Sequence, residues 1–478
     1  MKVIGRKKEI DELNRIYDSN NPEFVAIYGR RRVGKTFLIN KTFATRFTFK
    51  HTALSAIDDG NGDKVTTKDQ LNHFKESLKK YGYKGQRDIT DWFQAFYALE
   101  DLLIKSKDER MVVFIDELPW LDTPGSKFVN ALESFWNGWA NDKNIVFIIC
   151  GSANAWITKK MLSNYGGLYN RVTKEIELTS FSLKECEEFF QEKNVMLSRY
   201  DIVQAYMVFG GIPFYLDYFD ERLSLPQNID KLLFSKGAPF KNEFEKLFKS
   251  TFKNPDLIMK IVRVLSQKSI GYSRQEIITE VGINDGEVMA EALNALSASG
   301  FIIKYRPLTK DKKTMYYKLI DPFCLFYLRF VDKNLSFDEN MFERNNESTK
   351  TAVWKGLAFE NVCFNHINQI KNALEINVIA SESYPFIYIN EGKIESQIDL
   401  IIDRKDNIAN LCEIKFYSDE YLLNKEDYFK LMRKDKALSQ FLNKKQIIRN
   451  TLITSFGLRK NEYSNAYLYV INIEDLFK

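Results

Sequence analysis

A glycine-framed loop with three arginines, YGRRRVGKTF at residues 28–37, constrains the fold more than any other stretch of this sequence. An apolar run at residues 24–27 precedes it and another at residues 37–39 follows it, which predicts a strand, a loop and a helix in that order. The G-x-x-x-x-G-K-T spacing of residues 29–36 matches the P-loop, whose backbone N–H groups surround phosphate at a helix N-terminus. We therefore expect an α/β sheet with a phosphate site at the end of one strand.

The side chains of this loop predict how it binds ATP and Mg²⁺. Lys35 is expected to reach the β and γ phosphates and Thr36 to offer its hydroxyl to Mg²⁺, while Gly29 and Gly34 let the backbone approach closely. The predicted nucleotide-binding residues of the loop are Gly29, Arg30, Arg31, Arg32, Val33, Gly34, Lys35, Thr36 and Phe37.

The three arginines need not touch phosphate with their side chains, because a P-loop turns its amides inward and its side chains outward. One interpretation pairs an arginine with a nearby carboxylate and points another toward a partner domain or nucleic acid. The alternative leaves all three in solvent.

An acidic pair, Asp116-Glu117, directly follows the apolar run at residues 111–115 and so falls at the carboxyl edge of a buried strand. Asp116 is predicted to hold Mg²⁺, usually through water, and Glu117 to polarise the attacking water. The alternative is that Asp116 only caps the next helix.

Two later stretches supply candidates for contact with the transferring phosphate. Ser152 and Asn154 follow the strand-like run at residues 145–150, where either could sense the γ-phosphate, although Gly-Ser-Ala-Asn is also an ordinary turn. Arg171 precedes the next strand and could stabilise charge within the chain or in a neighbouring subunit, or it could be a surface arginine.

The motifs IGRKKEI, GRRRVGKT, FIDELPWL, ICGSANAW, LYNR and GGIPFYL together resemble the prokaryotic archaeal-type ATPases, a branch near the STAND and AAA+ P-loop NTPases. The resemblance covers about residues 1–320. It implies that Gly5 and Arg6 lie beside the nucleotide base and that Gly211 and Pro213 form the family's Gly-x-Pro element in a helical lid.

Periodicity along the chain predicts its domains. Strand-like and amphipathic segments alternate first, then a helical region follows, then three helices with a β-hairpin indicate a winged helix, and a further α/β region ends the chain. The expected domains are a P-loop core at 1–181, a lid at 182–245, a winged helix at 246–335 and a restriction-endonuclease-like α/β domain at 336–478. The polar run 338–350 is the linker candidate.

The winged-helix region offers nucleic acid one poor surface and one better one. The segment at recognition-helix position, 286–299, carries two glutamates and no basic residue, so we expect it to pack between domains. The turn TKDKK at 309–313 is the better candidate for contact with a nucleic-acid backbone, or it is a solvated wing tip.

A second group of charges lies in QIDLIIDRKDNIANLCEIKF, residues 397–416. Two strands joined by a polar turn would send Asp399, Glu413 and Lys415 to one face, and Glu360 on a preceding helix could complete the acidic set. Carboxylates that hold Mg²⁺ and a basic group that activates water are what phosphodiester hydrolysis needs.

This group resembles the PD-(D/E)xK nucleases, whose core is an Asp followed by Glu-x-Lys on adjacent strands. The resemblance spans about residues 350–478 and implies that Asp399 and Glu413 bind metal. No proline precedes Asp399, and the sequence leaves open whether Lys434, Lys436 or Gln440 reaches the site. The alternative is a solvated strand edge with a cross-strand ion pair.

Composition narrows the remaining choices. Five scattered cysteines without a C-x-x-C pair and three distant histidines favour neither disulfides nor zinc, which points to a reducing, cytoplasmic setting and to magnesium. No apolar stretch approaches the roughly 20 residues of a membrane helix. A net charge of +5 permits contact with nucleic acid without requiring it.

Two functions fit these patterns. The first is an ATPase whose nucleotide state controls a nuclease-like domain acting on nucleic acid, DNA more than RNA, in a chain that could form homo-oligomers. The second is a nucleotide-gated switch or scaffold that binds nucleic acid or protein without cutting it.

Overall fold

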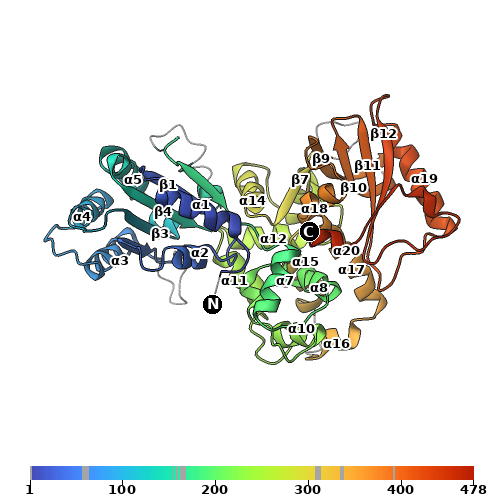
Figure 1. The fold of residues 1–478 in the computed structure, drawn as a ribbon, viewed down its shortest axis with the longest axis horizontal. Coiled ribbons are helices and arrows are strands. Elements are labelled where there is room, and N and C mark those ends of the chain that lie inside the picture. Colours follow the sequence, from blue (N-terminus) through green and yellow to red (C-terminus); the bar gives the residue numbers. More distant parts are fainter. Residues whose placement is uncertain are drawn as a thin grey trace. The chain divides into compact units, whose positions relative to one another are not determined.

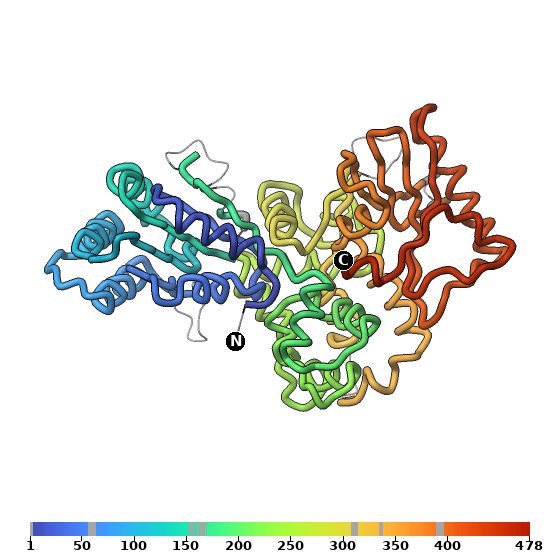
Figure 2. Tube along the Cα trace, viewed as in Figure 1, coloured from blue at the N-terminus to red at the C-terminus, as the bar shows by residue number. Residues whose placement is uncertain are grey.

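The computed structural model describes residues 3–55, 64–152, 154–157, 160–161, 168, 170–306, 314–333, 338–390 and 393–478; Figure 2 draws the others in grey. The chain forms two compact units. The first comprises residues 1–180 and 246–255, and the second comprises residues 181–245 and 256–478. The boundaries of the four expected domains stay a prediction.

Five parallel strands form the sheet of the first unit, in the order β2-β3-β4-β1-β5. Figure 1 labels β1, β3 and β4 of this sheet. They are β1 (Glu23–Tyr28), β2 (Phe49–Thr52), β3 (Met111–Asp116), β4 (Ile145–Gly151) and β5 (Lys174–Glu177). Near-continuous burial of β1, β3 and β4 is typical of a parallel sheet with helices on both faces. The predicted α/β fold is confirmed, and β1 ends where the glycine-framed loop begins.

Helix α1 (Lys7–Asp18) precedes the sheet, and further helices connect its strands, as the alternation of strand-like and amphipathic segments predicts. The connecting helices are α2 (Lys35–Thr42), α3 (Thr67–Lys80), α4 (Trp92–Ile104), α5 (Phe128–Gly138) and the short α6 (Asn154–Ile157). An aromatic cluster that includes Trp92, Phe96 and Phe135 packs α4 and α5 against Phe147 of β4. Burial of each such ring contributes about 1.5–3 kcal/mol, so this core holds the strand ends that carry the site.

The second unit begins with helices, in the region predicted as a lid. They are α7 (Leu183–Glu192), α8 (Arg199–Phe209), α9 (Pro213–Leu216), α10 (Leu225–Leu233) and α11 (Glu243–Lys249), of which α11 ends in the 246–255 segment of the first unit.

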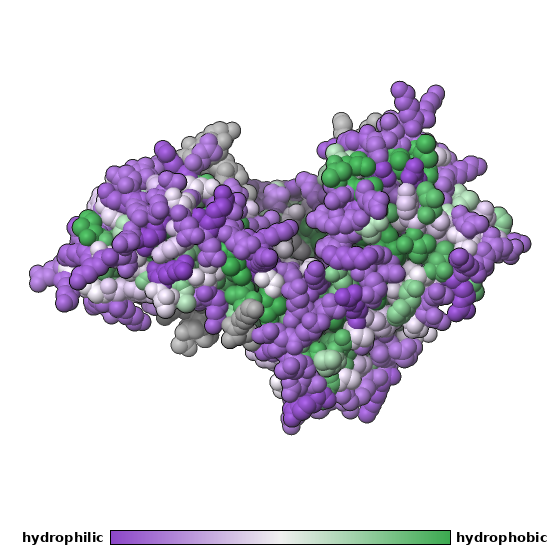
Figure 3. Space-filling view, in the orientation of Figure 1, coloured by the Kyte–Doolittle hydropathy of each residue, from purple (hydrophilic) through white to green (hydrophobic). Residues whose placement is uncertain are grey.

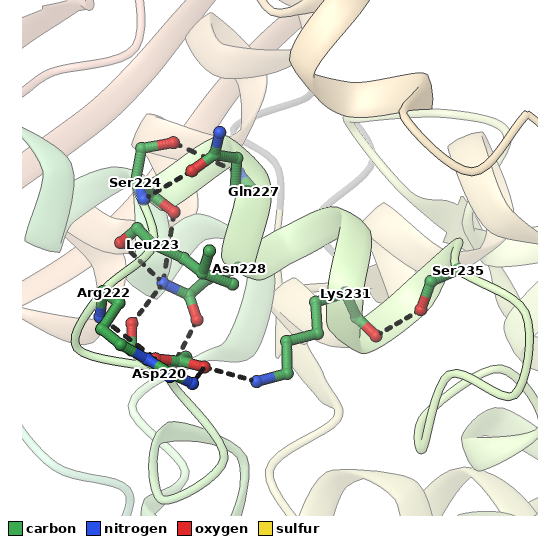
Figure 4. A network of polar contacts seen from close by, with 8 residues as sticks. All are labelled: Asp220, Arg222, Leu223, Ser224, Gln227, Asn228, Lys231 and Ser235. Atoms are coloured by element: carbon green, nitrogen blue, oxygen red, sulfur yellow. Dashed lines mark hydrogen bonds and ion pairs between the residues drawn. The ribbon is translucent and has the colours of Figure 1, made fainter.

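A polar network fixes the start of α10 (Figure 4). Ser224 and Gln227 form a capping box, and the Asn228 amide donates to the carbonyl oxygens of Asp220, Leu223 and Ser224. The Asp220 carboxylate accepts from Arg222 and Lys231, which lower its pKa. Because these groups bond to one another and to backbone, we read the network as structural.

Three helices and a small antiparallel sheet follow. They are α12 (Pro255–Leu265), α13 (Arg274–Val281), α14 (Glu287–Ala298), and the strands β6 (Tyr272–Ser273), β7 (Ile302–Tyr305) and β8 (Tyr316–Leu319), paired in the order β6-β8-β7. These are the elements expected of a winged helix, and that assignment stays a prediction. The TKDKK turn at 309–313 lies outside the described residues.

A mixed five-stranded sheet of order β13-β12-β11-β10-β9 forms the core of the C-terminal region. Its strands are β9 (Ser381–Asn390), β10 (Lys393–Arg404), β11 (Ile408–Lys415), β12 (Ile447–Thr454) and β13 (Tyr469–Ile471). β9 was not among the strands expected from the sequence, and it contains Pro385, a residue that is unfavourable inside a strand. Its place at the sheet edge explains why the proline is tolerated.

Helices flank this sheet and precede it. They are α15 (Pro322–Phe326), α16 (Met341–Asn345), α17 (Thr349–Asn365), α18 (Ile367–Ala373), α19 (Lys425–Ser439) and α20 (Ile473–Leu476), and a π-helical turn follows α15 at Tyr327–Val331. α17 packs against β10 and β11, and α19 against β10 and β12. The candidate catalytic residues of β10 and β11, Asp399, Glu413 and Lys415, therefore lie in a sheet against which these two helices pack.

Two features of this region differ from the sequence expectations. The helix expected to carry Glu360 is followed at once by a second one, and the two meet at His366, whose Nε2 accepts the Leu183 N–H at 2.9 Å. The polar run 338–350 contains α16, and the N–H groups of Phe342 and Glu343 donate to the Asp230 carboxylate at 2.7 and 2.9 Å. This run is therefore held against α10 rather than forming a free linker.

Figure 3 shows hydrophilic side chains over most of the face in view, with smaller apolar areas between them. Among the residues that the structure describes, none of the helices has both the length and the apolar character that crossing a bilayer requires.

Candidate functional site

The glycine-framed loop bends where the sequence places glycine. Gly29 has φ +152°, and a Cβ added there would lie 2.1 Å from the carbonyl oxygen of Leu178. Gly34 has φ +93° and caps the start of α2, and Arg32 also adopts a positive φ, of 75°. The backbone thus turns tightly between β1 and α2, leaving the first N–H groups of α2 at the loop as in an anion site.

Lys35 and Thr36 occupy the first positions of α2, and their side chains contact different groups, the loop backbone and the Asp116 carboxylate. The Lys35 side chain is only 6% exposed, and its ammonium donates to the carbonyl oxygens of Gly29 at 2.8 Å and Arg30 at 2.9 Å. The Thr36 hydroxyl donates to Asp116 Oδ2 at 2.8 Å. The structure therefore joins the two predicted Mg²⁺ ligands, Thr36 and Asp116, which 80 residues of sequence separate.

Asp116 and Glu117 lie at the carboxyl end of β3 and face different partners. Asp116 is buried and its second oxygen accepts the Glu117 N–H at 3.0 Å. Glu117 has a left-handed backbone with φ +50°, and its carboxylate accepts from the Ser152 hydroxyl at 3.0 Å and from the Ser152 N–H at 3.2 Å. Such a conformation is uncommon for a residue other than glycine and is often found at functional positions.

Ser152 therefore orients the predicted catalytic glutamate in this structure. It follows β4, where the sequence left open whether it or Asn154 senses phosphate; the side chain of Asn154 lies outside the described part of the chain. Burial, reinforced by the nearby Asp116 carboxylate, raises the pKa of the Cys150 thiol at the same strand end.

The arginines of the loop have at least one specific contact. Arg31 donates to the carbonyl oxygen of Ser250 at 3.0 Å, in the segment 246–255 that belongs to the first unit. This bond was not foreseen, because the sequence gives no sign that residues far beyond the core return to the loop. Val33 is buried, whereas Phe37 is 38% exposed and lies near Lys41.

The residues added by the family resemblance lie in different places. Arg6 caps α1 with φ +55° and donates to the carbonyl oxygen of Thr179, next to the Leu178 that contacts Gly29. Gly5 precedes it with φ +61°. Arg171 is exposed in the turn before β5. Pro213 begins α9 in the second unit, so its relation to the loop stays a prediction.

A second polar cluster lies in the C-terminal sheet. Asp399 Oδ2 accepts the backbone N–H of Ile414 at 3.0 Å, and the Lys415 ammonium lies 3.2 Å from Glu413 Oε2. Lys434 of α19 pairs with the other oxygen of Glu413. The structure thus brings together the predicted trio and selects Lys434 over Lys436 and Gln440, which the sequence could not.

Charge and burial shift the pKa values of the ionisable groups in this cluster. Burial raises the pKa of Glu413, and the Asp399 carboxylate raises it further, against the opposing effect of Lys434 and Lys415. Although burial alone would lower the pKa of Lys415, the carboxylates of Glu413 and Asp399 raise it. The acids of this cluster therefore interact with one another and with the lysines.

Glu360 on α17 joins the cluster, but with a partner that the sequence did not suggest. Its Oε2 lies 3.5 Å from the ammonium of Lys318 on β8, and both side chains are buried. Burial, with the Asp399 carboxylate, raises the pKa of Glu360 to about 7. Lys318 lies in a hairpin strand, where nothing in the pattern distinguishes it from a surface lysine.

The described residues contain no group of three or more His, Cys, Asp or Glu side chains arranged to hold a metal ion. The pair Thr36 and Asp116 still suits Mg²⁺, which takes oxygen ligands and commonly binds through one or two protein groups plus water and phosphate. Asp399 and Glu413 are also oxygen donors, but the lysine ammoniums already engage both oxygens of Glu413.

Residues 4–219 match the model of a family described as an ATPase domain predominantly from Archaea. An uncharacterized protein of Methanocaldococcus jannaschii is 27% identical over 445 residues, 91% of this chain and 92% of that protein. An uncharacterized ATP-binding protein of the same organism is 47% identical over 38 residues, 8% of this chain and 64% of that protein.

Two solved structures are also similar. A Walker-type ATPase of Pyrococcus abyssi aligns with a TM-score of 0.46 and 20% identity, over 68% of this chain and 96% of that one. The ORC2 protein of Aeropyrum pernix aligns with a TM-score of 0.43 and 15% identity, over 73% of this chain and 96% of that one. Likeness at this level carries no functional conclusion.

Proposed function

We propose that the chain is a Mg²⁺-dependent ATPase whose nucleotide state controls the C-terminal region in an action on nucleic acid. The hydrogen bond between Thr36 and Asp116 is the observation that carries the ATPase part, because it unites a hydroxyl and a carboxylate beside a loop built for phosphate. The match of residues 4–219 to an ATPase-domain family supports the same conclusion.

The described contacts assign each residue a task in this proposal. Lys35 would exchange the carbonyl oxygens of Gly29 and Arg30 for phosphate oxygens, which bear more negative charge. Thr36 and Asp116 would hold Mg²⁺, which when bound neutralises charge on the phosphates. Glu117, oriented by Ser152, would position the attacking water.

Substitutions in the loop test the ATPase. Lys35→Ala should abolish ATP binding, and Glu117→Gln should retain binding while turnover falls on the order of 10²–10⁴-fold. Lys41→Ala, on the exposed side of the same helix, is the matched control and should behave as the parent. Unchanged turnover in both test variants would refute the assignment.

We further propose that Asp399, Glu413, Lys415 and Glu360 form a phosphodiesterase site, with DNA as the favoured substrate. A plasmid-nicking assay with Mg²⁺ or Mn²⁺ tests this, comparing the parent with Asp399→Asn and Lys415→Ala. Lys405→Ala, in the turn between the same two strands, is the control. Nicking that survives in both test variants, or is missing from the parent, would remove the cutting function.

The second candidate is a nucleotide-gated switch or scaffold that binds without cutting. The lysine pairs on Glu413 and the buried pair of Glu360 with Lys318 favour it, because carboxylates neutralised by ammonium groups are poor metal ligands. ATP-dependent binding of a DNA fragment without cleavage would support this alternative.

The remaining predictions concern setting and assembly. We propose a cytoplasmic location, which the five free, buried cysteines support, since they form no disulfide. Arg171 could act within the chain or across a homo-oligomer, and ATPase activity that rises with protein concentration and falls in Arg171→Ala would indicate the second.

A further inference from the structure

The second unit contains a cavity of about 420 Å³ whose described lining is positively charged. Lys268, Lys318, Arg329 and Lys333 contribute to its wall, and no aspartate or glutamate is among the lining residues that the structure describes. None of these described lining residues belongs to the nucleotide loop, and Lys318, the partner of Glu360, connects the cavity to the carboxylate cluster.

The cations of this cavity are only partly neutralised by nearby acids. Lys268 pairs with Glu276 at 3.2 Å and Lys318 with Glu360 at 3.5 Å. Neither Arg329 nor Lys333 forms an ion pair within the described part of the chain, and the adjacent Asp332 is engaged by Arg263. An excess of positive charge in one concavity favours an anionic ligand.

Buried polar atoms in the same wall lack partners. Trp354 and Asn361 are 3% and 4% exposed, and among described groups neither Trp354 Nε1 nor Asn361 Oδ1 has a hydrogen bond. Arg329 Nε is also buried without a hydrogen bond to any described group, and Arg329 lies in the π-helical turn Tyr327–Val331. Unsatisfied buried groups are rare in proteins, and π-helical turns are frequent at functional sites.

We propose that this cavity binds a small phosphorylated molecule, of the class of a nucleoside diphosphate. The cavity volume falls within the range of small-molecule sites, and clustered lysine and arginine side chains recognise phosphate. Because Lys318 also pairs with Glu360, an anion that engages Lys318 competes with that carboxylate, and this last step rests on the proposed function of the C-terminal cluster.

Calorimetry on the full chain carrying Lys35→Ala tests the proposal. Because this substitution is expected to abolish nucleotide binding at the loop, the binding that remains can be assigned to the cavity. The probes are pyrophosphate, ADP and a short DNA duplex. Pyrophosphate and ADP should bind with one-to-one stoichiometry. Adding Lys268→Gln and Lys333→Gln, both at exposed positions, should weaken binding roughly tenfold or more.

The matched control adds Lys444→Gln and Lys445→Gln, two exposed lysines outside the cavity with the same change in charge. Equal affinity in the cavity variant and this control would overturn the proposal, as would binding of DNA that pyrophosphate does not displace. The ATPase of the parent is measured separately, so failure of the cavity and failure of the nucleotide loop give different results.

Discussion

The ammonium of Lys318 lies 3.5 Å from the carboxylate of Glu360, with both side chains buried. One residue comes from the small sheet of the second unit and the other from the helix against the C-terminal sheet. The pair therefore links the predicted winged-helix region to an acid of the predicted nuclease-like site.

Lys318→Met should destabilise the protein in a pH-dependent way. Burial raises the folded pKa of Glu360 from 4.5 to about 7, so stability falls as pH rises through this window, because the unfolded chain loses its proton first. Without the ammonium this pKa rises further, and we expect a loss of about 3 kcal/mol at pH 8 and a smaller loss at pH 6.

Urea unfolding at both pH values measures this difference. Lys318→Met combined with Glu360→Gln should recover most of the stability at pH 8, because no buried charge is then left alone. An equal loss at the two pH values would contradict the assignment of the pair.

Gly29→Ala should damage the nucleotide loop. The new Cβ would meet the Leu178 carbonyl oxygen at 2.1 Å in a backbone region that alanine avoids, so we expect a loss on the order of 1–3 kcal/mol together with weaker ATP binding. Gly138→Ala, at the end of α5 with no described atom within 4 Å of the new Cβ, should be neutral or stabilising. Thermal unfolding of the two variants would distinguish these results.

His366 should make stability depend on mildly acidic pH. Its Nε2 accepts the Leu183 N–H at 2.9 Å, its Nδ1 pairs with the Val362 carbonyl oxygen, and burial lowers its pKa from 6.5 to about 4. The unfolded chain binds the proton first, so up to about 3 kcal/mol is lost as pH falls from 6.5 through 4. His366→Gln should show a shallower slope over this window, and an identical slope would refute the assignment.

Ser152→Ala should slow ATP turnover more than it weakens ATP binding. Ser152 contacts Glu117 through its hydroxyl at 3.0 Å, and loss of a group that orients a catalytic residue typically costs 10–100-fold. Ser126→Ala, in another loop of the same unit, is the control. If ATP affinity fell as much as turnover did, Ser152 would instead serve in nucleotide binding.

The sequence by itself predicted much of this molecule. Local patterns predicted the strands of the first unit, the loop from Gly29 to Thr36 and the acidic pair at the end of β3. These patterns are the period of the hydrophobic residues and the spacing of the glycines, and both depend only on residues that are close together in the sequence. The alternation of side chains between the two faces of β10 and β11 likewise predicted that Asp399 and Glu413 share one face. These features depend on short stretches of chain, so no fold was needed to find them.

Only the tertiary structure decided which distant charges meet. The Arg31 bond to Ser250, the choice of Lys434, the Lys318 pair with Glu360 and the cationic cavity all join segments from different elements. The sequence around a lysine on a strand or helix is the same whether its ammonium is exposed to solvent or pairs with a buried carboxylate. Packing between elements determines which partner it meets. For that reason the sequence indicated the candidate catalytic groups, and the fold revealed the charged and polar groups that contact them.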